Sequence, residues 1–262
     1  MNPLRITLAQ SAIAWGDKDF NLRLQYLRLN QVGGYSDLVV LSETFSTGFD
    51  MKPAAVAEPV DGPTISTLRR WATECEVAIC GSFIACGDTP GTYANRAFFL
   101  TPEGDAYFAD KRHLFRPGGE AKRYTRGDER LIVNYRGWNI CLLVCYDLRF
   151  PVWSRNRNNE YDLLIYVANW PASRRQAWDI LLPARAVENI SYVCGVNRIG
   201  KDPHGIRYDG GSAIYSPLGE QLASVGDNRP GTVTLSLDGD ALMHLREKFP
   251  AWRDADGFSI QI

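Results

Sequence analysis

Short apolar runs rich in β-branched residues alternate with amphipathic segments along the chain, and this alternation restricts the fold more than any other feature. The pattern predicts strands at 4–10, 37–42, 77–85, 93–100, 105–109, 131–135, 138–144, 163–167, 192–197, 212–215, 221–224 and 232–237. Helices are predicted at 17–31, 64–76, 151–158, 174–189 and 241–248. Strand pairs mixed with strand–helix units are typical of α/β domains. We therefore predict a four-layer α-β-β-α sandwich, in which two sheets face each other and helices cover both outer faces.

No feature of the sequence divides the chain into parts. It has 262 residues, of which 45% are hydrophobic and 23% charged, as is typical of globular proteins. No linker rich in Pro, Gly or Ser and no repeat interrupts it. Residues 1–262 are therefore predicted to form a single domain.

Charge and hydropathy argue against several classes of partner. The 29 Lys and Arg residues balance 30 Asp and Glu residues, so we expect no nucleic-acid partner. The longest apolar runs, such as 38–41 and 140–144, fall far short of the ~20 residues that cross a bilayer, so no membrane partner is expected. The first ten residues do not resemble an export signal, and we predict a cytoplasmic protein.

The cysteines and histidines predict no metal site. Six cysteines show no C-x-x-C pair, and the chain has only three histidines. Most of the cysteines lie in apolar runs, which suits small buried side chains in a reducing compartment.

Cys145 stands out among the cysteines because it ends an apolar strand. The run 138–144 stops at this residue, and Pro151 is well placed as the first residue of a following helix. A thiol in such a turn can face open space beside backbone N–H groups, which favours a thiolate and stabilises a negative oxygen on an attacked substrate. The plainer interpretation is that Cys145 only terminates a buried strand.

Two further strand ends carry ionisable residues that could serve this thiol. No histidine, the usual partner, follows a strand end in an obvious way, whereas Glu43 and Lys111 do. Burial in a cavity would raise the pKa of Glu43, which could then accept the thiol proton. A protonated Lys111 could donate to a developing oxyanion. Taken singly, each is more commonly an end-of-strand surface charge or part of a salt bridge.

Three motifs around these residues resemble the carbon-nitrogen hydrolase (nitrilase) superfamily, whose members use a Glu-Lys-Cys triad in this chain order. They are E-x-F at 43–45, K-x-H-L-F at 111–115 and C-Y-D-x-R-F-P at 145–151. Each motif alone would be weak, but three in order over more than a hundred residues are specific. The resemblance continues through 166–171, 184–189 and 249–256, and it is most pronounced toward the omega-amidases. It implies a nitrilase-like sandwich and hydrolysis of the terminal amide of 2-oxoglutaramate and 2-oxosuccinamate.

Carried over to this sequence, the resemblance makes Cys145 the nucleophile and Glu43 the general base and then acid. Lys111 and the backbone N–H of Tyr146 would hold the oxyanion. The family's second glutamate would be Glu120, although the plainer interpretation of Glu120 is a solvated loop charge. Neither a metal nor an organic cofactor is implied, and the partner is a small-molecule amide.

Substrate selection is less defined by the sequence. A substrate with a distal carboxylate needs a cation, and the candidates near the predicted site are Arg116, Arg149, Arg174 and Arg175. Arg149 could equally form a structural pair with an acid such as Asp147. Phe45 and Trp170 are predicted to wall the pocket, with core packing as the alternative.

The helix at 174–189 carries Trp178, Leu181, Leu182 and Ala186 at helical spacing. These exceed what one sheet would be expected to cover, and in the superfamily this region packs subunits together, so a homodimer or larger homo-oligomer is expected. Packing within one subunit is the alternative.

For function, the alternatives are an N-carbamoyl or aliphatic amidase, a nitrilase, or a catalytically silent binding protein. The intact triad argues against the last.

Overall fold

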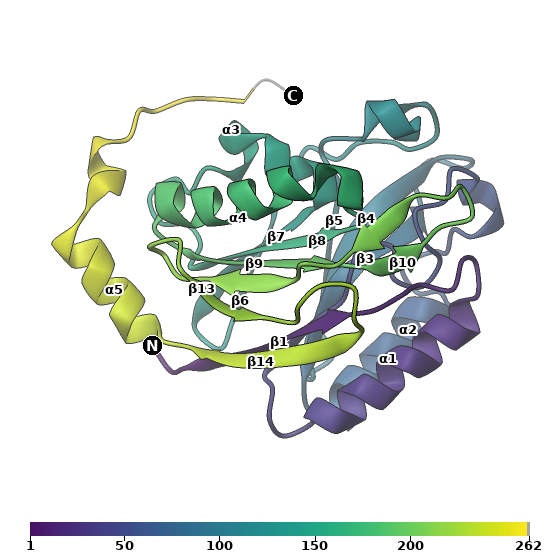
Figure 1. Ribbon diagram of the computed structural model, residues 1–262, viewed down its shortest axis with the longest axis horizontal. Coiled ribbons are helices and arrows are strands. Elements are labelled where there is room, and N and C mark those ends of the chain that lie inside the picture. Colours follow the sequence, from purple (N-terminus) through teal and green to yellow (C-terminus); the bar gives the residue numbers. More distant parts are fainter. Residues whose placement is uncertain (261–262) are drawn as a thin grey trace.

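The computed structural model describes residues 1–260 and contains two mixed β-sheets that lie face to face (Figure 1). In the first sheet the strand order is β14-β1-β2-β3-β4-β5, with β1, β2 and β3 parallel to one another. Its strands are β1 (Leu4–Gln10), β2 (Leu38–Val40), β3 (Ala78–Cys86), β4 (Tyr93–Leu100), β5 (Ala106–Asp110) and β14 (Gly231–Leu237).

The second sheet has the order β13-β12-β9-β8-β7-β6, with β7, β8 and β9 parallel. Its strands are β6 (Leu131–Tyr135), β7 (Trp138–Val144), β8 (Leu163–Ala168), β9 (Tyr192–Asn197), β12 (Ala213–Tyr215) and β13 (Gln221–Ser224). The predicted hairpin of β6 and β7 is confirmed. Arg136 and Gly137 make its two-residue turn with φ of 52° and 81°, and positive φ at both positions matches the twist of the flanking strands.

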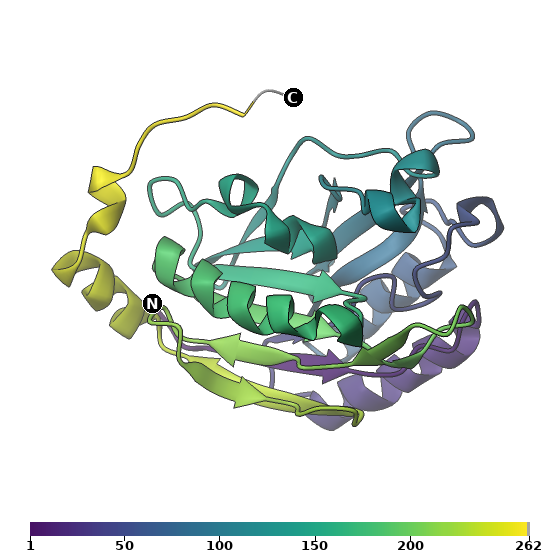
Figure 2. The ribbon, with the colours of Figure 1, turned by 45° about the horizontal axis from the view of Figure 1, so that its top comes forward.

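Helices cover both outer faces, so the predicted four-layer sandwich is confirmed (Figures 1 and 2). On the first sheet lie α1 (Lys18–Val32) and α2 (Pro63–Glu74), and on the second lie α3 (Pro151–Ser154) and α4 (Arg175–Asn189). Helix α5 (Gly239–Lys248) lies beside the N-terminus (Figure 1). Short 3-10 helices are η1 (Pro53–Ala55), η2 (Arg116–Gly118), η3 (Glu120–Lys122), η4 (Cys145–Arg149), η5 (Ala172–Arg174) and η6 (Ala251–Asp254).

Alternate residues of the central strands fill separate apolar layers. Leu4 and Ile6 of β1 point toward the opposite sheet and pack with Ile140 and Leu142 of β7, all at most 2% exposed. The intervening positions of the central strands pack under the helices instead. Complete burial of one such side chain stabilises the fold by roughly 1.5–3 kcal/mol. Because both faces of the central strands are buried, their sequences are continuous apolar runs.

Two predicted helices differ from the structure. Helix α3 ends at Ser154 instead of 158 because Asn156 turns inward, where its side chain donates to the Tyr161 carbonyl at 2.9 Å. Helix α1 buries polar side chains that its periodicity did not single out. The buried Asn21 side chain donates a hydrogen bond to the Ser46 carbonyl at 2.8 Å, and this bond allows a polar side chain to lie on the buried face of the helix.

Helix α4 buries most of the apolar side chains that were expected to exceed the cover of one sheet. Trp178, Leu182 and Ala186 are completely buried within the subunit, and the Trp178 indole donates to the Gly211 carbonyl at 2.8 Å. That expectation was therefore wrong for these residues. Within residues 1–260, no helix combines the length and apolar character needed to span a membrane.

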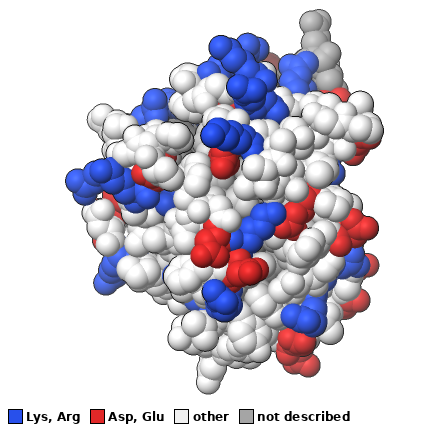
Figure 3. All heavy atoms as spheres, turned by 90° about the vertical axis from the view of Figure 1, so that its right-hand side faces the viewer, with Lys and Arg blue, Asp and Glu red and all other residues white. Residues whose placement is uncertain are grey.

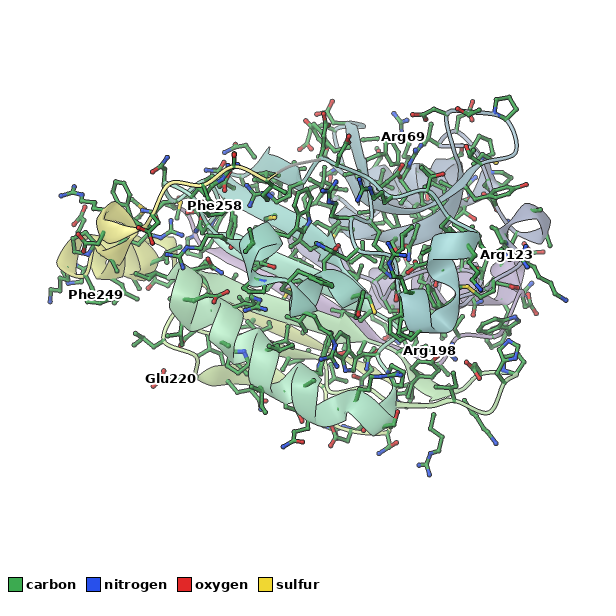
Figure 4. The ribbon with its side chains drawn as sticks, turned by 90° about the horizontal axis from the view of Figure 1, so that it is seen from above. Arg69, Arg123, Arg198, Glu220, Phe249 and Phe258 are labelled. Carbon is green, nitrogen blue, oxygen red and sulfur yellow. The ribbon has the colours of Figure 1, made fainter. Side chains whose placement is uncertain are left out.

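A short hairpin was not predicted. Strands β10 (Ile199–Lys201) and β11 (Arg207–Asp209) pair antiparallel beyond the end of β9. Each has three residues and neither alternates clearly, so the sequence carried little signal for them. Arg198, just before this hairpin, and Arg123, in the loop after β5, lie toward the same end of the molecule, opposite Phe249 (Figure 4).

Candidate active site

The predicted triad comes together where strands of both sheets end. Glu43 lies just beyond β2, Lys111 directly follows β5, and Cys145 directly follows β7. Ligands in open α/β sheets bind outside the carboxyl ends of the strands, and all three residues line one pocket there of about 230 Å³.

Lys111 lies at the centre of the charged groups. Its ammonium Nζ is 2.9 Å from Glu43 Oε1 and 3.0 Å from Glu120 Oε2, and all three side chains are at most 2% exposed. Burial alone would lower the pKa of Lys111, but the carboxylates of Glu120 and Glu43 outweigh it and raise the pKa well above its usual value. Lys111 is therefore a fixed cation, and Glu120 is not the solvated loop charge of the plainer interpretation.

Glu43 is held ionised by several donors. The backbone N–H of Asn169 donates to its Oε2 at 2.7 Å, and the Asn95 amide donates to its Oε1 at 2.8 Å. Burial favours the neutral acid, but the Lys111 ammonium and these hydrogen bonds prevail, so the pKa of Glu43 lies below its usual value. The expectation of a raised pKa was wrong because the Lys111 charge, with the hydrogen bonds from Asn169 and Asn95, outweighs burial.

Glu120 differs from Glu43 in the direction of its shift. Burial and the neighbouring Glu43 carboxylate raise the pKa of Glu120, although Lys111 and the backbone N–H of Phe115 oppose this. Environments that push the pKa values of two carboxyl groups apart commonly separate their roles. Glu43 is thus the carboxyl group that rests ionised and is available to accept a proton, whereas Glu120 has the stronger tendency to be protonated.

Cys145 begins η4 with a φ of 48°, in the left-handed region. Its side chain is partly accessible from the pocket, which Glu43 and Lys111 also line. Burial, together with the Glu43 carboxylate, raises the pKa of this thiol well above its usual value despite the opposing Lys111 charge. The expected thiolate is therefore not the resting form. The site holds a neutral thiol beside an ionised base.

Two arginines lie at the pocket mouth. The Arg149 guanidinium carbon is 5.1 Å from the Trp170 ring centre, and that of Arg174 is 5.1 Å from the Phe115 ring centre. Both are exposed and line the pocket, and neither has an acidic partner among residues 1–260. They provide two cations without internal counter-ions.

The other arginine candidates are placed differently. Arg116 is exposed and does not line the pocket, and Arg175 pairs with Asp179 at 2.6 Å and Asp227 at 2.9 Å. The alternative pair of Arg149 with Asp147 does not form. Asp147 instead accepts hydrogen bonds from His113 and Val144.

The aromatic predictions divide. Trp170 lines the pocket, as does Tyr146. Phe45 does not line the pocket, so its predicted place in the pocket wall is corrected to core packing. It is 1% exposed and packs in the layer under α1 and α2, with its ring centre 6.1 Å from that of Phe98. Phe49, four residues later, lines the pocket in its place.

Sequence reasoning missed several residues that shape the site. Asn95 and Asn169 hold Glu43, and Asp202 and Tyr208 of the β10–β11 hairpin line the pocket. Asn169 directly follows the buried strand β8, the same signal that singled out Glu43, so it could have been found. No three His, Cys, Asp or Glu side chains of residues 1–260 group as metal ligands.

The molecular face at this end carries both signs of charge interspersed, without a continuous patch of either (Figure 3). Its distinctive chemistry is therefore inside the pocket.

Sequence comparison links this chain to enzymes that cleave amides. The carbon-nitrogen hydrolase family profile matches residues 5–246. The omega-amidase YafV of Escherichia coli is 45% identical over 260 residues, covering 99% of this chain and 100% of that protein. The 2-oxoglutaramate amidase of Bacillus subtilis is 29% identical over 252 residues, covering 95% of this chain and 96% of that protein.

Structure comparison agrees. A carbon-nitrogen hydrolase superfamily protein from Xanthomonas campestris, solved with an arsenic adduct in its active site, has 41% identity and a TM-score of 0.96, covering 100% of both chains. An amidase from Nesterenkonia sp., carrying acrylamide added to its active-site cysteine, has 27% identity and a TM-score of 0.82, covering 94% of this chain and 98% of that one. The sequence, the fold and the arrangement of Glu43, Lys111 and Cys145 therefore lead to one conclusion: this chain belongs to the carbon-nitrogen hydrolase family.

Proposed function

We propose that this amidase hydrolyses the terminal amide of small 2-oxo acid omega-amides, namely 2-oxoglutaramate and 2-oxosuccinamate, through a thioester on Cys145. The observation that carries the proposal is the pairing of a buried Glu43–Lys111–Cys145 cluster with two unpaired arginines at the mouth of the same pocket. The relatives named as omega-amidase and 2-oxoglutaramate amidase support the substrate class.

The first half of the reaction forms the thioester. Glu43 accepts the Cys145 proton as the sulfur attacks the amide carbon, because a base with a lowered pKa and a thiol with a raised one do not exchange the proton beforehand. The carbonyl oxygen becomes negative and is stabilised by the Lys111 ammonium and the Tyr146 N–H. Glu43 then returns its proton to the nitrogen, the carbon–nitrogen bond breaks, and ammonia leaves.

The second half releases the acid. Glu43 takes a proton from water, the resulting hydroxide adds to the thioester carbon, and the oxyanion again lies against Lys111. The carbon–sulfur bond then breaks, and the thiolate recovers a proton from Glu43. Glu120 supports both halves by holding Lys111 through contacts of 3.0 and 3.1 Å to its two oxygens.

Arg149 and Arg174 bind the distal carboxylate of the substrate in this proposal. Guanidinium groups recognise carboxylates through paired N–H donors, and these two need not leave an internal acid first. Trp170 carries the Arg149 guanidinium on its ring and walls the pocket. A simple aliphatic amide has no group for either arginine, which argues against that rival activity. An N-carbamoyl amino acid also carries a carboxylate, so this rival must be separated by the substrate test.

The test is ammonia release from 2-oxoglutaramate, 2-oxosuccinamate, glutamine, asparagine, an N-carbamoyl amino acid and a simple nitrile. We expect rapid turnover only of the two 2-oxo amides. Rapid turnover of another substrate would retain the cysteine mechanism and reject the proposed substrate. Absence of turnover across this panel and a set of aliphatic amides would reject the amidase proposal.

We also propose that the protein forms a homodimer through α4. Ile180 and Val187 on this helix are 57% and 53% exposed, and the nearby Leu218 is 64% exposed. Ile180 and Val187 are seven residues apart and so lie on the same side of the helix, and exposed apolar side chains grouped on one face are typical of interfaces. Sedimentation should give a dimer for the native chain and a monomer for Val187→Glu.

We propose a cytoplasmic location as well. Its support is the six free cysteines, since free thiols are typical of reducing compartments.

A further inference from the structure

The catalytic groups come from two different sheets, so the reaction depends on how the sheets are aligned. Lys111 follows β5 of the first sheet, and Cys145 follows β7 of the second. The layer between the sheets is apolar, and burial of apolar surface is not directional. Alignment at the precision of a hydrogen bond therefore needs polar contacts that cross from one sheet to the other.

One carboxylate makes such a contact between the lysine segment and the nucleophile turn. Asp147 Oδ1 lies 2.8 Å from His113 Nδ1 and accepts the His113 backbone N–H at 2.9 Å. Its Oδ2 accepts the Val144 N–H at 3.0 Å. Asp147 thus holds the residue just before Cys145 with one oxygen and a residue two positions after Lys111 with the other.

The histidine ring is fixed in the orientation that this contact requires. It stacks on Phe150 with ring centres 3.7 Å apart and planes 8° from parallel, and its edge meets Trp153. Because a carboxylate only accepts hydrogen bonds, the ring hydrogen that faces Asp147 must be on Nδ1. Asp147 is 1% exposed, so water does not compete freely for this bond.

The backbone at Cys145 gives this contact a second purpose. A non-glycine residue with positive φ costs of order 1–3 kcal/mol and persists only where its surroundings hold it. The Val144 N–H bonded to Asp147 is the donor immediately before that residue. Loss of the contact would let the thiol move relative to Lys111.

Resting on the amide hydrolysis proposed above, we infer that His113 and Asp147 are positioning residues that align the Cys145 turn with Lys111 across the two sheets. Their contact sets the distance at which the attacked carbonyl oxygen meets the ammonium. The comparable contact of Asn169 with Glu43 crosses the sheets as well, but it positions the base and not the nucleophile.

The test separates the hydrogen bond from the ring. His113→Phe keeps the stacking on Phe150 and removes the ring donor, leaving only the backbone N–H bonded to Asp147. His113→Asn keeps a side-chain donor near the Nδ1 position and removes the ring. His244→Phe, at an exposed histidine of α5, is the control. A displacement of ~1 Å can cost roughly a hundredfold in rate, so kcat of His113→Phe should fall about 10- to 100-fold with KM changed less than about threefold. His113→Asn should recover most of the loss.

Alkylation of Cys145 by iodoacetamide gives a readout that needs no substrate. We expect His113→Phe to react about tenfold more slowly than the native protein, because its thiol no longer meets Glu43 correctly, and His113→Asn to react at nearly the native rate. Failure of the native enzyme to release ammonia would reject the proposed function and leave this comparison valid. Equal alkylation rates in all three proteins, equal losses in both His113 variants, or an effect confined to KM would overturn the inference.

Discussion

Removal of either mouth arginine should raise KM for a 2-oxo acid amide while leaving kcat nearly unchanged. Arg149 and Arg174 line the pocket, whereas Glu43, Lys111 and Cys145 are the groups proposed to act on the amide. A contact made equally in the ground state and the transition state contributes to KM alone. Arg149→Ala and Arg174→Ala therefore test the carboxylate site without touching the triad.

The structure sets the magnitude. A hydrogen bond to a charged group contributes about 1.5–3 kcal/mol, and both arginines are exposed, so the lower end of that range applies. A loss of ~1.5 kcal/mol corresponds to roughly a tenfold higher KM for each variant. Because both guanidiniums would bind one carboxylate, the double variant should lose less than the roughly hundredfold expected for independent sites.

The assay is steady-state ammonia release from 2-oxoglutaramate at low and high salt, beside an uncharged amide. Arg116→Ala is the matched control, since Arg116 is an exposed arginine that does not line the pocket. Salt should raise KM in the native enzyme because it screens exposed charges, and less so in the double variant. An unchanged KM in both single variants, or an equal loss with the uncharged amide, would refute this role for the arginines.

Three further perturbations test the rest of the site. Cys145→Ala should abolish ammonia release and change the free energy of unfolding by less than ~1 kcal/mol; native-level turnover in this variant would exclude the thioester. The Lys111 ammonium and the asparagine donors hold the pKa of Glu43 below its usual value of 4.5, so the acid limb of kcat/KM should lie below pH 4.5. The stability that ionised Glu43 contributes should be lost only as the pH falls through this lowered pKa. An acid limb near neutrality would contradict this. Phe45→Ala should lower the free energy of unfolding by ~3–5 kcal/mol, as measured by urea denaturation, with KM unaltered; a raised KM would return Phe45 to the pocket wall.

The sequence predicted several strands with their exact bounds, including edge strands that are only partly buried. The bounds of β1, β4, β6, β7, β9 and β13 agree with prediction residue for residue. The prediction failed where distant residues decide the conformation. The inward turn of Asn156 that follows α3 depends on Tyr161 and Asn189, and no local periodicity reports such partners.

For the candidate site, the sequence predicted the positions of the residues but not their protonation states. Strand ends and motif order located Glu43, Lys111 and Cys145, because each residue alone has a plainer explanation but three motifs in one order are specific. Their protonation could not be predicted in the same way. Burial raises the pKa of Glu43, but the Lys111 ammonium, followed by hydrogen bonds from Asn169 after β8 and Asn95 of β4, lowers it below its usual value. The two asparagines are 126 and 52 positions away along the chain.

These donors change the way the nucleophile is activated. A thiolate formed in advance would react with any electrophile that enters the pocket, because the thiolate is the reactive form of cysteine. Here burial and the Glu43 carboxylate keep the Cys145 proton on sulfur. In the proposed mechanism, proton transfer to Glu43 becomes favourable when charge moves on from sulfur to an attacked electrophile, such as an amide whose oxygen lies against Lys111. The geometry that binds a substrate amide is therefore also, in this mechanism, the geometry that activates the thiol.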